Sequence, residues 1–153
     1  MSSWKLGAAD VEDPISSGAI QRLARADAGT HALIERAHQL IRSARSLSAD
    51  DPVTAYVVAY DAARHAGAAL LAKQWLRATT AGGHVALEKA IGAQFGGIFA
   101  RLVALRRRRH ELDYPVSEED FADRDETVRA IATAEQIVND AQTILDTGQL
   151  TTF

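Results

Sequence analysis

The sequence predicts an all-α protein, an up-and-down bundle of four to five helices. Apolar residues recur at spacings of three and four along most of its 153 residues, which is the period of an amphipathic helix. No stretch keeps the strict apolar and polar alternation of a half-buried strand, and no repeat of fixed period occurs. Alanine-rich faces and short connections between the periodic segments favour antiparallel helices as neighbours.

The length suits one domain with a single core. Residues 1–15 lack sustained periodicity and are predicted to form a flexible N-terminal arm, residues 16–148 the bundle, and residues 149–153 a C-terminal tail. The sequence contains no cysteine, which excludes disulfides, thiol nucleophiles and zinc–thiolate sites. Its uncharged stretches fall short of the roughly 20 apolar residues that a membrane span needs, and no secretory leader is recognised. We therefore expect a cytoplasmic protein that does not enter a membrane.

The first two periodic segments have defined limits. A helical pattern covers residues 20–47 and is broken near Gly29. Asp51 is a plausible N-cap for the next helix, with Pro52 at its first position. That helix carries one apolar stripe over about five turns, as far as Leu71. We expect it to be the central helix of the bundle.

Three further helices are predicted in the second half of the chain. A short one covers residues 84–93, after a glycine-rich break. The next should end within a residue or two of Asp113, because Pro115 disfavours helical geometry at the residue before it. The last helix covers residues 124–146, and Gly148 follows as a stop signal.

Four consecutive arginines, Arg106 to Arg109, close the penultimate helix. Because the net charge of the chain is −3, any contact with nucleic acid must come from such a local patch. At about 100° per residue, Arg109 lies about 20° from Leu102 and continues the apolar stripe of the helix. Arg107 and Arg108 point roughly 140° and 240° away from Leu102, towards solvent. The four side chains are therefore not equivalent.

An arginine on an inward face needs a partner, and two interpretations are open. In the structural one, Arg109 pairs with Asp113 one turn later, and the arginines also suit the negative end of the helix dipole. In the functional one, Arg109 binds a phosphodiester through its guanidinium fork. His110 would then move a proton near neutral pH, and Tyr114 would donate a hydrogen bond. No set of side chains has metal-ligand spacing, so we expect neither a metal nor another cofactor.

Arg64 is a second arginine that continues an apolar stripe. It is expected either to pair with an acid on a neighbouring helix or to provide a second phosphate contact near Arg109. Tyr60 shares its helix and is expected to be a core residue. His84, at the start of the short helix, is expected to cap or anchor the loop, with anion binding as the alternative.

Residues 32–145 resemble the HEPN superfamily, specifically its minimal stand-alone bacterial members of the actinobacterial type. The resemblance depends on the two long helices and on the residues Tyr-Asp-Ala-Ala-Arg-His-Ala at 60–66. It also depends on the Gly83-His84 helix start and on the arginine-rich segment that ends at Asp113-Tyr114-Pro115. It implies a four- or five-helix bundle that forms a homodimer. Active members cut RNA without a metal, across the dimer interface.

The family motif is an arginine, a polar residue and, a few residues later, a histidine. The resemblance places Arg109 and His110 at the first two positions, and Tyr114 falls where the histidine would be. It implies an RNA- or nucleotide-facing protein, in active form a metal-independent ribonuclease of a toxin-antitoxin or defence system. The alternative is a non-catalytic dimeric helical module that docks a partner such as a nucleotidyltransferase; an antitoxin is the other expected partner. The expected catalytic residues are Arg109, His110, Asp113 and Tyr114, and the expected nucleic-acid contacts are Arg64, Arg106, Arg107 and Arg108.

Overall fold

A computed structural model describes residues 8–24, 29–80, 83–148 and 150. Its elements in chain order are α1 (Ala8–Ser16), β1 (Ile20–Arg22), α2 (Thr30–Leu47), α3 (Pro52–Lys73), β2 (Leu76–Ala78), α4 (Gly83–Phe95), α5 (Gly97–Asp113), the 3₁₀ helix η1 (Glu118–Asp120) and α6 (Arg124–Thr147). The predicted all-α class is confirmed, and the described part contains six α-helices where four to five were expected. Across those same residues, we find no helix with the length and apolar character required to cross a membrane.

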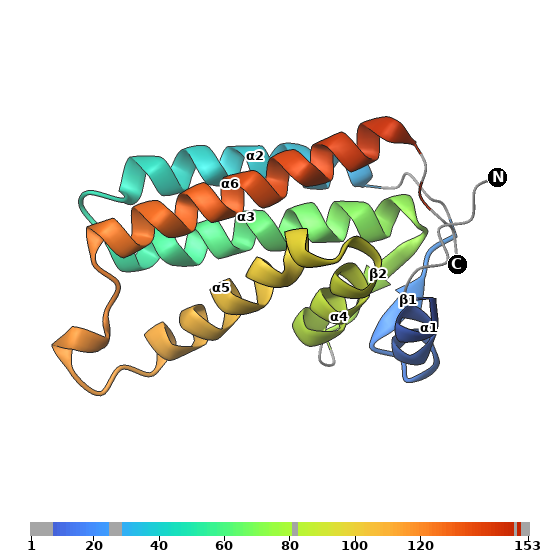
Figure 1. Ribbon diagram of the computed structural model, residues 1–153, viewed down its shortest axis with the longest axis horizontal. Helices are drawn as coiled ribbons and strands as arrows, with labels where there is room; N and C mark the ends of the chain where they lie inside the picture. Colours follow the sequence, from blue (N-terminus) through green and yellow to red (C-terminus); the bar gives the residue numbers. More distant parts are fainter. Residues whose placement is uncertain (1–7, 25–28, 81–82, 149, 151–153) are drawn as a thin grey trace.

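Helix α3 is the centre of the bundle, as its long apolar stripe predicts. It contacts α2 and α6 on one side and α4 and α5 on the other (Figure 1). Small side chains let the neighbouring helices approach it, because alanine fills little space between helix axes. The alanines of α3 that are fully buried are Ala55, Ala59, Ala62, Ala63, Ala66 and Ala69.

The ends of three helices follow the local signals in the sequence. The Asp51 carboxylate accepts a hydrogen bond of 3.0 Å from the backbone N–H of Thr54, so Asp51 is the N-cap of α3 with Pro52 at its first position. Helix α5 ends at Asp113, immediately before the residue that Pro115 restricts. Gly148 follows α6 with a φ of 65°, a left-handed conformation that glycine adopts without strain.

The described part of the predicted N-terminal arm is helical. Residues 8–15 belong to α1, in which Val11 and Pro14 are buried. The segment is too short to display helical periodicity, and it is held by contacts with α4 and β1. Residues 1–7 of the predicted arm, and residues 149 and 151–153 of the predicted tail, lie outside the described residues.

The structure contains two short strands that the sequence pattern does not predict. Strands β1 and β2 form an antiparallel pair in which Ile20 faces Ala78 and Arg22 faces Leu76. Each strand has three residues, too few to show alternation. Their pairing also depends on a partner far along the chain, which local periodicity does not report.

A buried amide pair ties the end of α3 to the end of α4. The side-chain amides of Gln74 and Gln94 are fully buried and donate to each other at 2.5 and 3.0 Å. We expect Gln94→Leu to lower the free energy of unfolding by about 1–3 kcal/mol, because it leaves the Gln74 amide without its partner. Replacing both glutamines by leucine should recover most of that loss. Urea denaturation measures both variants, and a double variant no more stable than the single one would contradict the assignment.

Candidate functional site

The four arginines of α5 diverge around the helix and have four different surroundings. Arg106 donates to Glu88 of α4 at 2.5 Å, and Arg108 donates to Glu126 of α6 at 2.5 Å. Arg107 is exposed, and Arg109 lies over a side chain of α3. The expectation that Arg108 faces solvent is therefore wrong, since α6 supplies a carboxylate that the phase of α5 alone does not reveal.

Arg106 and Arg108 are both fixed by ion pairs. The Arg108 guanidinium holds the Glu126 carboxylate with two nitrogens, at 2.5 and 3.2 Å, and a third donor reaches Glu111 at 3.1 Å. Burial raises the pKa of Glu88, and the Arg106 guanidinium opposes that rise by hydrogen bonding and by its charge. Both guanidinium groups are largely committed to these carboxylates within the bundle.

Arg109 faces inward, as its helical phase predicts. Its guanidinium carbon lies 5.6 Å from the centre of the Tyr60 ring, a cation–π distance. The expected pair with Asp113 is present, but the closest N–O distance is 3.7 Å and Asp113 is exposed. That distance is too long for a hydrogen bond. The Nε atom of Arg109 is buried without a hydrogen-bond partner.

Arg64 of α3, like Arg109, lies near an acid without forming a hydrogen bond to it. Its nearest acid is Asp61 on its own helix, 3.6 Å from Nε, rather than an acid on a neighbouring helix. Among the described residues, the buried side-chain nitrogen and oxygen atoms that lack a hydrogen-bond partner are the Nε atoms of Arg64 and Arg109. Buried polar groups are nearly always paired in native proteins, so these two donors are exceptional among the described residues.

Tyr60 and His84 link the two arginines. The buried Tyr60 hydroxyl lies 2.9 Å from Nδ1 of His84, within hydrogen-bond distance. Burial raises the pKa of Tyr60 to about 12, and the charges of Arg64 and Arg109 oppose the rise. Burial, followed by the same two charges, lowers the pKa of His84. At neutral pH the tyrosine therefore keeps its proton while His84 is a neutral imidazole.

The sequence predicts a core position for Tyr60, which its burial confirms. For His84 it predicts loop anchoring, with anion binding as the alternative, and does not predict the contact with Tyr60. The available signal was the common face of Tyr60 and Arg64 on α3, four residues apart. The position of His84 opposite that face depends on the packing of α4 against α3.

His110 and Tyr114 lie on another side of α5. Their rings are 5.0 Å apart, and Tyr114 is 71% exposed. They line an open hollow with Arg108, Glu111 and Asp120, a set that includes neither Tyr60 nor His84. The structure thus places Arg109 with Tyr60, whereas it places two of the other three expected catalytic residues, His110 and Tyr114, with Arg108.

The fold and the site together describe a helical-bundle protein with a candidate anion site formed by α3, α4 and α5. Comparison with family models, curated proteins and solved structures yields no significant match. The resemblance to the HEPN superfamily accordingly stays a prediction. Within the described residues, no three His, Asp or Glu side chains are grouped so as to hold a metal ion.

Proposed function

We propose that this protein binds RNA at Arg64 and Arg109 and cleaves it without a metal ion. The observation that carries the proposal is the pair of buried Nε donors without acceptors, one on each of two helices. A phosphodiester supplies oxygens that accept charge-assisted hydrogen bonds from guanidinium groups. The resemblance to HEPN proteins supports RNA as the source of that phosphodiester, and a homodimer in a toxin-antitoxin or defence system as the context.

RNA brings its own nucleophile to such a site, the 2′-hydroxyl. In the proposed reaction His84 takes the proton of that hydroxyl, and the 2′-oxygen bonds to phosphorus while the bond from phosphorus to the 5′-oxygen breaks. The departing 5′-oxygen takes a proton from water. Arg64 and Arg109 stabilise the charge that develops on the phosphoryl oxygens. Tyr60 orients the imidazole, and Nε2 is free to accept a proton in the tautomer whose Nδ1–H donates to Tyr60.

Purified protein incubated with mixed RNA and a chelator tests the proposal. We expect fragments that end in a 2′,3′-cyclic phosphate and a 5′-hydroxyl, resolved by denaturing gel electrophoresis and end-group analysis. His84→Gln should lower the cleavage rate by about 10²- to 10⁴-fold, the usual contribution of a general base. The rate should also fall at acidic pH, because protonated His84 no longer accepts a proton.

The matched control is His110→Gln. It makes the same substitution at a histidine that contacts Tyr114, whereas His84 contacts Tyr60. We expect it to retain most of the activity. If His110→Gln abolishes cleavage while His84→Gln does not, the proton carrier is His110, the residue that the sequence predicts for this role. Intact RNA at high protein concentration would reject cleavage altogether.

A non-catalytic interaction module is the second candidate. It is favoured by the ion pairs of Arg106 and Arg108, which commit two of the four arginines to packing within the bundle. It is also favoured by exposed apolar side chains after α5, with Val116 96% and Phe121 44% exposed. The docked partner would be a nucleotidyltransferase or an antitoxin. This function predicts no cleavage, and partner binding that persists in Arg109→Ala and is lost in Phe121→Ser.

A further inference from the structure

A cavity of about 470 Å³ opens between α2, α3, β2 and the start of α4, and it shares Arg64 and His84 with the candidate site. Its volume lies within the range of small-molecule sites, roughly 300–1,000 Å³. Its walls are mainly apolar side chains from five different segments: Leu23, Leu33, Ala68, Ala72, Leu76 and Leu87. Such a cavity suits a ligand with an apolar body.

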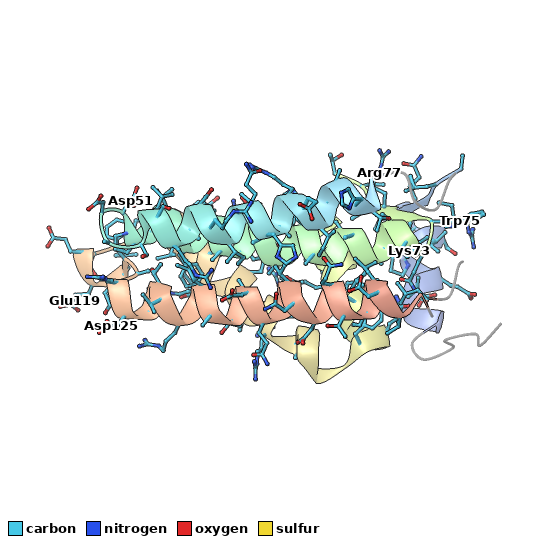
Figure 2. All side chains as sticks on the ribbon, turned by 90° about the horizontal axis from the view of Figure 1, so that it is seen from above. Asp51, Lys73, Trp75, Arg77, Glu119 and Asp125 are labelled. Atoms are coloured by element: carbon cyan, nitrogen blue, oxygen red, sulfur yellow. The ribbon has the colours of Figure 1, made fainter. Side chains whose placement is uncertain are left out.

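One end of the cavity is cationic. Arg64 and His84 both line it, and the Arg64 side chain is 29% exposed, so part of it is accessible. Arg77 also lines the cavity. Figure 2 shows it towards the same end of the bundle as Lys73, so it adds a positive charge to the lining that is separate from that of Arg64. None of the described residues that line the cavity is an aspartate or glutamate. The nearest carboxylate to Arg64, that of Asp61, is outside this lining. The charge therefore favours an anionic group at the Arg64 end.

The dimensions of the apolar part follow from helix geometry. Arg64, Ala68 and Ala72 are spaced four residues apart and lie along one face of α3. At 1.5 Å per residue, the stripe from Arg64 to Ala72 is about 12 Å long. Alanine at the last two positions leaves open the space that larger residues would fill. This stripe provides a cationic end and a narrow apolar floor.

We propose that this cavity binds a small amphiphilic anion, a hydrocarbon chain that ends in a carboxylate or a phosphate. The head group accepts hydrogen bonds from Arg64, and the chain lies over Ala68 and Ala72 against Leu33, Leu76 and Leu87. An apolar body without a charged head would leave the Arg64 charge without an anionic partner in the cavity, and a polar anion such as acetate would leave the leucine walls in contact with water. This proposal shares Arg64 and His84 with the proposed RNA site. Its test contains no RNA, so a failure of ligand binding is distinguishable from a failure of cleavage.

Isothermal titration calorimetry with octanoate, below its micelle-forming concentration, tests the proposal. We expect octanoate to bind at one site, and affinity to rise by about fourfold per methylene group from hexanoate to octanoate. Octanol, which has the chain without the charge, and acetate, which has the charge without the chain, should each bind at least about tenfold more weakly. Comparing the affinity of the protein for octyl phosphate with its affinity for octanoate distinguishes the two head groups.

Two variants locate the site. Arg64→Gln should weaken octanoate binding by about tenfold or more, because a charge-assisted hydrogen bond is lost. Ala68→Phe places a ring across the floor of the cavity and should abolish binding. The matched control is Arg45→Gln, on the exposed side of α2 where Arg45 pairs with Glu135, and it should bind octanoate as the unaltered chain does. Circular dichroism and thermal unfolding establish that each variant is folded. Equal binding of octanoate and octanol, or unchanged binding in both folded cavity variants, would overturn the proposal.

Discussion

Arg109→Ala is expected to lower RNA cleavage by about 10²- to 10³-fold, the usual effect of removing one group that stabilises developing charge. Its guanidinium is the one member of the arginine run that lies over Tyr60, and its Nε atom has no hydrogen-bond partner. RNA binding should also become less dependent on salt, with a slope reduced by about 0.7 for one lost phosphate contact on a single strand. Cleavage rates at saturating RNA and binding titrations over a range of salt concentrations measure the two effects.

Two further variants show whether the effect of Arg109 depends on its charge or on the planar shape of its guanidinium group, and whether it is specific to this position. Arg109→Lys keeps a positive charge without the planar fork, so we expect partial binding and little cleavage. Arg45→Ala removes an exposed arginine of α2 and should change neither quantity. The fold should survive Arg109→Ala, because the cation–π contact and the exposed ion pair each contribute about 1 kcal/mol or less. Undiminished binding and cleavage in folded Arg109→Ala would refute the assigned role.

Arg106→Leu is expected to destabilise the fold by about 3 kcal/mol at pH 7. Glu88 is only 6% exposed, and Arg106 is its ion-pair partner at 2.5 Å. Removing one member of a buried pair leaves the other charge without compensation, which costs about 3–5 kcal/mol. The lower value applies because Arg106 itself is 27% exposed. Urea denaturation at pH 7 measures the loss.

The pH dependence of that loss identifies Glu88 as its cause. The pKa of Glu88 in the folded protein already lies above its ordinary value of 4.5 because of burial, and removal of Arg106 takes away the interactions that lower it. The folded variant therefore binds a proton more readily than the unfolded chain does. The loss in free energy of unfolding caused by Arg106→Leu is therefore largest above the raised pKa of Glu88, and it shrinks as the pH falls towards 4.5.

A second substitution provides the control for this pair. Adding Glu88→Gln to Arg106→Leu removes the buried charge and should restore most of the stability at pH 7. The same two substitutions measured singly complete a double-mutant cycle and give the coupling between the side chains. A deficit of the single Arg106→Leu variant that is equal at pH 5 and pH 7 would assign the loss to packing of the arginine stem instead.

Helix positions were predictable because their signals are local. The Asp51 cap, the Pro115 restriction and the Gly148 stop each act within a few residues, and each marks an observed helix end. The inward direction of Arg109 was predictable for the same reason, since it follows from the phase of its own helix. The strand pair was not, because β1 and β2 lie more than 50 residues apart and each has three residues.

By itself, the sequence determined the helical class, most helix limits and the inward direction of Arg64 and Arg109. Only the tertiary structure decided which side chains meet them. In the folded protein Tyr60 contacts His84. Arg106 and Arg108 pair with carboxylates on α4 and α6. His110 and Tyr114 lie away from the side of Arg109 that faces Tyr60. The physical reason is that periodicity fixes the direction of a side chain on its own helix, whereas its partners depend on how other helices pack.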